Sequence, residues 1–239
     1  MATYVLSDIH GEYDMFLKML DKIALKETDE LYILGDLVDR GPHPIKVLQK
    51  VMTMPNVIPM VGNHELMALE AFEFVNTEIT EGALAEITQE TLDNVSLWLE
   101  HNGGATTLKE YGKLSTEERQ EIVDFIRDFS IYEELSVGDT EYLLVHGGLG
   151  NFSPEKDIED YSLHDLVWKH ADYDTQYFED VTVITGHTPT QMIKGNDNPG
   201  RIFHKNNHIA IDCGACFNGG RLAAIRLDDG AEFYVERNE

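Results

Sequence analysis

Short apolar runs in the first third of the chain carry acidic, amide or imidazole side chains at their carboxyl ends. The runs span residues 3–6, 31–34 and 57–61. The side chains that follow them include Asp8, His10, Asp36 and Asn63. Such runs are typical of buried strands, and the carboxyl ends of parallel strands meet at one edge of a sheet. These groups together predict a divalent-metal centre that suits manganese, iron or zinc.

The elements that position these groups can be predicted from the spacing of the apolar residues. Helical spacing in residues 15–23 and 45–51 makes strand and helix alternate, which indicates a parallel sheet. Later apolar runs predict further strands over residues 142–145, 182–185, 208–211, 222–227 and 231–235. We therefore expect an α/β fold in which two sheets pack face to face and helices flank them.

Residues 66–135 differ from both flanks because helical spacing dominates there. Ser115 and Glu118 form a predicted capping box at the start of one of these helices. We expect a helical insertion beside the metal centre, inside a single domain that covers residues 1–239.

The charge of the chain limits its partners. Eighteen Lys and Arg residues stand against 44 Asp and Glu residues, which gives a net charge of −26. This charge argues against a nucleic-acid partner and against an anionic membrane. It also repels phosphate, but screening over about 8 Å allows a local group of cations to bind it.

The sequence contains no apolar stretch of the length that spans a membrane, and no signal-peptide pattern. The two cysteines, Cys213 and Cys216, form one C-x-x-C motif. A structural zinc site would need a second pair to complete tetrahedral coordination. We therefore expect reduced structural thiols and a cytoplasmic location.

Five sequence blocks occur in an order that carries a family resemblance. They are Asp8-Ile9-His10-Gly11, GDLVDRG at 35–41, GNHE at 62–65, His146-Gly147-Gly148 and Gly186-His187-Thr188. The order resembles the signature of the PPP-type metallophosphoesterases, and especially the bacterial and phage serine/threonine protein phosphatases of the calcineurin-like group. The resemblance runs from residue 8 to about residue 220. It implies an α/β/β/α sandwich of two mixed sheets and two divalent ions, with manganese expected and iron or zinc as alternatives.

The resemblance also implies a role for each ligand. Asp36 bridges both ions, as a carboxylate with two oxygens can. Asp8 and His10 bind the first ion. The ligands of the second ion are Asn63, His146 and His187.

The same resemblance implies how a phosphomonoester is cleaved. A hydroxide that bridges the two metals attacks phosphorus in line with the leaving group. His64 is the expected general acid, and Asp39 accepts the proton of its other ring nitrogen. Arg40 supplies a planar fork that matches two phosphate oxygens.

The phosphate is expected to meet Arg40, the neutral Asn63 and a second basic group. Bacterial relatives usually place an arginine two residues after a tryptophan. Here Trp168 is followed by Lys169 and His170, and either residue is a candidate substitute. Neither offers the bidentate geometry of a guanidinium. Arg201 and Arg221 are further possible donors.

Two alternatives accompany the main expectation of a serine/threonine protein phosphatase acting on phosphorylated protein or a small phosphoester. Symmetrical dinucleoside tetraphosphate hydrolases share the fold and metals, but typically carry Ala at the position of Asp39 and GNHD for GNHE. Asp39 and Glu65 therefore favour phosphomonoesters. A non-catalytic metal- or phosphate-binding regulator is supported only by the Lys169-His170 replacement, because every expected ligand and the acid are present.

Overall fold

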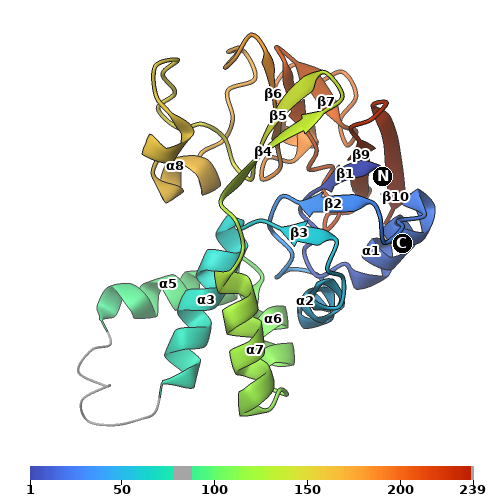
Figure 1. Cartoon of the computed structure of the whole chain (residues 1–239). Helices are drawn as coiled ribbons and strands as arrows, with labels where there is room; N and C mark the ends of the chain where they lie inside the picture. The colour runs from blue at the N-terminus through green and yellow to red at the C-terminus, as the bar shows by residue number, and fades with distance from the viewer. Residues whose placement is uncertain (78–87, 238–239) are drawn as a thin grey trace.

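The computed structural model describes residues 1–77 and 88–237, which form two five-stranded sheets with helices around them (Figure 1). The first sheet has the order β10-β9-β1-β2-β3, and the second has the order β4-β5-β6-β8-β7. The first comprises β1 (Thr3–Leu6), β2 (Glu30–Ile33), β3 (Val57–Pro59), β9 (Arg221–Arg226) and β10 (Ala231–Glu236). The second comprises β4 (Tyr132–Val137), β5 (Thr140–Val145), β6 (Val181–Thr185), β7 (Phe203–Lys205) and β8 (His208–Ala210).

Both sheets mix parallel and antiparallel pairs. Strand β2 pairs in parallel with β1 and β3, as the alternating strand and helix pattern predicts, whereas β9 runs antiparallel to β1. Strands β5, β6 and β8 are parallel, and β4 and β7 form antiparallel edges. The expected sandwich of two mixed sheets is therefore confirmed.

The two sheets share a buried apolar layer. Val5 of the first sheet and Leu34, directly after β2, belong to the same cluster as Leu144 and Ile184 of the second sheet, and all four are fully buried. Burial of apolar surface on both inner faces is the main force that holds the sheets together. The packing brings the carboxyl ends of β1, β2, β5 and β6 toward one another.

Helices α1 (Tyr13–Ile23) and α2 (Pro44–Met52) connect the parallel strands of the first sheet and contact each other. A short helix, α8 (Leu163–Val167), precedes β6. Two single 3₁₀ turns occur at Ile158–Asp160 and Thr190–Met192. No helix in the described ranges is both long enough and apolar enough to cross a membrane.

Four helices form a group beside the sheets (Figure 1). They are α3 (Asn63–Asn76), α5 (Gln89–His101), α6 (Gly104–Tyr111) and α7 (Thr116–Arg127). Phe72, Trp98 and Tyr111 pack at their centre, and all three side chains are fully buried. The predicted capping box of α7 is present, because Ser115 Oγ accepts from Glu118 N and the Glu118 carboxylate accepts from Ser115 N.

The predicted bounds of this helical insertion, 66–135, differ from the observed helices at both ends. Helix α3 begins at Asn63, inside the GNHE motif, and α7 ends at Arg127. Residue 135 lies in β4, whose Glu133 and Glu134 weaken the apolar alternation that marks a strand. Residues 78–87 of the predicted insertion lie outside the described residues.

His208, the first residue of β8 in the second sheet, is buried. Its Nε2 lies 2.9 Å from Thr185 Oγ1, and the ring packs against Tyr173 and Tyr177. Its Nδ1 is buried without a partner. Burial lowers the pKa of His208 to about 4.

The low pKa of His208 predicts a pH-dependent stability. The neutral ring stabilises the fold fully above the unfolded-state pKa of about 6.5, and this contribution disappears as pH falls through about 4. The free energy of unfolding in urea should fall between these two pH values in the wild-type protein. In His208→Gln this fall should be smaller by up to about 3 kcal/mol. His101→Gln, at an exposed position, should keep the wild-type slope, and an unchanged slope in His208→Gln contradicts the prediction.

Candidate metal centre and catalytic site

The candidate site is built on tight turns that follow the strands. Ten non-glycine residues in the described part of the chain have positive φ. Six of them, with φ between 47° and 71°, are Asp8, His10, Asp36, Asp39, Arg40 and His187. This region costs most residues about 1–3 kcal/mol, and such strain gathers at functional sites. The turns point these side chains back toward one edge of the sheets instead of continuing the strands.

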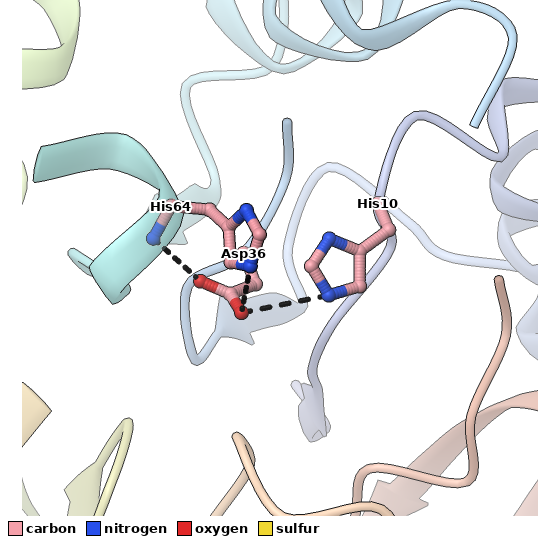
Figure 2. Close-up of side chains that lie close together, drawn as sticks. All are labelled: His10, Asp36 and His64. Carbon is pink, nitrogen blue, oxygen red and sulfur yellow. Dashed lines mark hydrogen bonds and ion pairs between the residues drawn. The ribbon is translucent and has the colours of Figure 1, made fainter. Parts of the chain in front are cut away.

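The carboxylate of Asp36 lies at the middle of the site. Its Oδ2 is 3.5 Å from His10 Nε2, and its Oδ1 is 3.4 Å from His146 Nε2. Figure 2 shows the same carboxylate beside the rings of His10 and His64. Because its two oxygens face different histidines, Asp36 has the geometry of a bridging ligand.

Asp8 and His10 form one half of the site. An Asp8 oxygen is 4.0 Å from His10 Nε2, and the carboxylate accepts hydrogen bonds from the Ser7 hydroxyl and from His187 N. His10 Nδ1 donates to Val38 O at 3.0 Å. This bond fixes the tautomer and leaves the Nε2 lone pair directed at the centre, an arrangement common in metal-binding histidines.

Asn63, His146 and His187 form the other half. Asn63 Oδ1 lies 3.1 Å from His146 Nε2 and 2.9 Å from His187 Nδ1. His146 Nδ1 donates to Leu34 O at 2.5 Å, so its Nε2 lone pair also faces inward. An oxygen and two imidazole nitrogens therefore meet at one point.

Burial controls the electrostatics of the site. It raises the pKa of Asp8 and Asp36 well above their usual range, and the proximity of other carboxylates adds to the rise. It lowers the pKa of His10 and His146 well below the usual value, and that of His187 to about 4. The imidazoles are therefore neutral and can bind a metal, and the buried carboxylates need a positive charge beside them. This set of ligands fits divalent cations.

His64 and Asp39 form a buried pair next to this centre. His64 Nδ1 donates to Asp39 Oδ2 at 2.6 Å, and the two residues are 1% and 0% exposed. Burial lowers the pKa of His64, whereas the bond to Asp39 raises it. The ligand atoms of His10, Asp36 and His64 also lie within 4.8 Å of one another. The Nε2 of His64 faces the centre, where it could either donate a proton or bind a metal.

The guanidinium of Arg40 faces the same space. Its Nη1 lies 2.8 Å from His10 Nε2, and its Nη2 lies 3.0 Å from His64 Nε2. The planar group also stands over the ring of Phe217, 5.6 Å from the ring centroid. This position lets the fork meet two oxygens of a phosphate at the centre.

Of the two candidates that follow Trp168 for the second phosphate contact, His170 lies against the metal centre. Its ring packs against that of His187 at a tilt of 32° with 4.8 Å between centroids, and its Nδ1 lies 2.7 Å from Thr188 Oγ1. Lys169 and His170 are both exposed. Both remain candidates, and the structure brings His170 closer to the proposed ligands.

Glu65 has a structural role that the sequence analysis did not assign. Its fully buried carboxylate accepts four backbone N–H groups. The donors, with their N···O distances, are Asp36 (2.8 Å), Leu37 (2.8 Å), Val38 (3.2 Å) and Gly62 (2.9 Å). Burial raises the pKa of Glu65 to about 7, although the four hydrogen bonds lower it. Its place three residues after Gly62 is a capping-box signal that predicts part of this role.

Asp212 was also missed, and it lies beside the first half of the site. It is 4% exposed, its Oδ1 accepts from Gly214 N at 2.8 Å, and its charge raises the pKa of Asp8. Burial raises the pKa of Asp212 itself to about 6. No motif in the sequence analysis included this residue.

Replacing Glu65 should loosen the turn that carries Asp36. Glu65→Gln sets an amide NH₂ against two backbone N–H donors, which should lower the free energy of unfolding by about 2 kcal/mol. Glu118→Gln removes the carboxylate of an exposed capping box and should cost about 0.5 kcal/mol. Denaturant unfolding of both variants tests this, and equal losses would show that the four hydrogen bonds of Glu65 do not stabilise the turn.

The two roles open to His64 predict different metal contents. If His64 is the acid, His64→Ala should retain two equivalents of manganese and lose turnover by about 100-fold or more. Asp36→Ala should lose both metal and turnover, because it removes the bridge between the two halves. Isothermal titration with manganese, beside assays under chemistry-limited conditions, measures both effects. Loss of one equivalent in His64→Ala would make His64 a ligand.

Comparisons with known proteins agree with this architecture. The family model for calcineurin-like phosphoesterases matches residues 1–219. A symmetrical bis(5'-nucleosyl)-tetraphosphatase from Erwinia tasmaniensis is 35% identical over 102 residues, which cover 41% of this chain and 37% of that protein. The enzyme of that name from Acidovorax ebreus is 30% identical over 151 residues, with coverage of 62% and 44%. The matched regions thus span less than half the length of these curated relatives.

Solved structures show the same fold at low sequence identity. A candidate diadenosine tetraphosphatase matches with a TM-score of 0.68 and 16% identity, over 98% of this chain and 93% of that one. A protein serine/threonine phosphatase from Saccharomyces cerevisiae matches with a TM-score of 0.57 and 14% identity, over 99% and 79%. At these identities the likeness concerns the fold alone.

Proposed function

The chain belongs to the calcineurin-like phosphoesterase family, and on this basis we propose that it hydrolyses symmetrical dinucleoside tetraphosphates with two divalent ions. The observation that carries a two-ion site is the placement of Asp36, whose two oxygens face His10 and His146 at 3.5 and 3.4 Å. Hydrolysis of phosphoesters with metal ions is the chemistry of the family. The substrate, the pair of ions and the residues that bind them are proposals.

The proposed ligands fall into two sets that share Asp36. Asp8 and His10 would hold one ion, and Asn63, His146 and His187 would hold the other. Manganese is the expected metal, with iron or zinc as alternatives. When bound, the ions polarise the phosphoryl oxygens and lower the pKa of water so that it can attack phosphorus.

The protein side chains then bind the phosphate and manage the proton. Arg40 directs both Nη atoms into the centre and binds two phosphoryl oxygens. His64 would give its Nε2 proton to a leaving oxygen that is basic enough to need one, and Asp39 keeps the ring oriented through Nδ1. His170, which packs against His187, is the proposed second phosphate contact.

The names of the curated relatives favour a dinucleoside tetraphosphate over the expected phosphorylated protein. Both matched relatives of 30% identity or more described above are symmetrical tetraphosphatases. The likeness to a protein phosphatase, in contrast, is one of fold. The comparisons thus support the alternative of the sequence analysis better than its main expectation.

A phosphomonoester is the second candidate, because of the Asp39–His64 pair. The nucleoside diphosphate released from a tetraphosphate is a stable anion and leaves with little need for a proton. The alkoxide of a phosphoserine is a strong base and needs one. A buried acid whose ring is held by a carboxylate at 2.6 Å suits the second reaction.

Product analysis separates the two candidates. Metal-stripped protein resupplied with manganese should convert diadenosine tetraphosphate to two molecules of adenosine diphosphate, measured by ion-exchange chromatography. Phosphoserine, phosphothreonine and phosphotyrosine peptides are assayed in parallel for released phosphate. Release from the peptides alone would replace the first candidate by the second. No hydrolysis of either class, with two ions bound, would contradict both.

Arg40 should matter for its shape as well as its charge. Arg40→Ala should reduce kcat/KM about 100-fold on the preferred substrate, and Arg40→Lys should recover less than a tenth of that loss, because an ammonium group binds only one phosphoryl oxygen well. Steady-state kinetics of both variants at saturating manganese give the comparison. Full activity in Arg40→Lys would show that only the charge matters.

A further inference from the structure

Two side chains from the helical insertion hold the carboxylate of Asp39. Trp98 Nε1 of α5 donates to Asp39 Oδ2 at 2.7 Å, and Thr107 Oγ1 of α6 donates to Oδ1 at 2.5 Å. The Thr107 hydroxyl also accepts from Asp39 N at 3.0 Å. Asp39, Trp98 and Thr107 are all 0% exposed. Both oxygens of the carboxylate are therefore bonded from a part of the chain remote from it in sequence.

These bonds act directly on His64. The oxygen that accepts from Trp98 is Oδ2, which also accepts from His64 Nδ1 at 2.6 Å. A carboxylate fixed at both oxygens cannot rotate without breaking a buried hydrogen bond. The ring of His64 is consequently fixed with its Nε2 toward the centre.

The position of Trp98 is itself fixed by close packing. Its ring meets Phe72 edge to face, with 6.3 Å between centroids. A Cβ added at Gly104 would stand 2.2 Å from two indole carbon atoms, so this glycine is required for the indole to lie there. The insertion is thus built to present the indole N–H at one place.

The turn of the insertion that contains Gly103 also contacts Arg40, the residue after Asp39. Gly103 O accepts from Arg40 N at 3.1 Å, and a Cβ on Gly103 would stand 2.8 Å from the backbone N of Arg40. Gly103 has φ +83°, a conformation that glycine adopts without strain. The insertion therefore touches both Asp39 and Arg40.

We propose that Trp98 and Thr107 are positioning residues for the proton donor, so that the helical insertion is part of the catalytic unit. This inference rests on the proposed role of His64. As the bond between phosphorus and the leaving oxygen breaks, that oxygen takes the Nε2 proton of the His64 imidazolium. The attacking water forms the new bond to phosphorus and releases one proton to solvent, from which His64 is protonated again.

Leaving groups of different basicity provide the test. Trp98→Phe keeps an aromatic ring but loses the N–H donor, and Thr107→Val keeps the shape but loses the hydroxyl. Each should lower kcat on phosphoserine by about tenfold or more, because the alkoxide needs the proton. With p-nitrophenyl phosphate, whose leaving group departs unprotonated, the loss should stay under about twofold, and KM should change little on either substrate.

Two control variants separate positioning from loss of structure. Tyr111→Phe removes a fully buried hydroxyl that accepts from Asn76 Nδ2, and it keeps the ring that stacks on Phe72. This change does not affect the contacts of Asp39. This variant should not change the ratio of kcat on phosphoserine to kcat on p-nitrophenyl phosphate. Thr107→Ser restores the hydroxyl and should recover the phosphoserine rate. Equal losses on both substrates in Trp98→Phe, or a change of the rate ratio in Tyr111→Phe as large as that in Trp98→Phe, would overturn the proposal.

A spectroscopic measurement tests the positioning without turnover. The Nδ1 proton of His64, held at a 2.6 Å contact, should give a low-field proton resonance in metal-stripped protein that His64→Gln abolishes. In Trp98→Phe and Thr107→Val the resonance should shift or broaden, and in Tyr111→Phe it should not. An unmoved resonance in the first two variants refutes the inference. Inactive wild-type protein with a shifted resonance in these variants refutes the proposed function alone.

Discussion

The carboxylate of Asp36 carries the constraint on which the rest of the site depends. It is 2% exposed, lies between two imidazole nitrogens, and shares its surroundings with the buried Asp8. Buried carboxylates this close together repel each other and are poorly solvated, so the arrangement is stable with both ionised only when cations enter. The fold places this group at the junction of its two sheets, where histidines from both can reach it.

Hydrogen bonds to the backbone hold this unfavourable arrangement in place. Glu65 accepts four backbone N–H groups around the turn that carries Asp36, and Asp36, Asp39 and Arg40 adopt left-handed backbone conformations there. Such conformations persist only where the surroundings determine them. Because Glu65 belongs to α3, a helix of the insertion fixes the turn that carries Asp36 of the metal centre. A glutamate at this position is thus tied to the architecture, which limits its value as a marker of substrate class.

The sequence allowed prediction of the features that depend on short-range pattern. The apolar runs of β1, β2 and β3 and the side chains after them could be predicted, because buried parallel strands and their carboxyl ends leave a local signal. Edge strands β4 and β7 could not, because exposed residues obscure the alternation. The role of Trp98 could not be predicted either, since its partner Asp39 lies 59 residues away. The assignment of six ligands to two ions stays a prediction.

The central claim is that Asp36 bridges two ions, and diffraction from crystals grown with manganese tests it most directly. Anomalous difference maps should contain two peaks about 3.5–4 Å apart. One should lie against Asp8 and His10, the other against Asn63, His146 and His187, with the Asp36 carboxylate between them. A single peak, or a peak bound by His64 Nε2 without Asp36, would contradict the account.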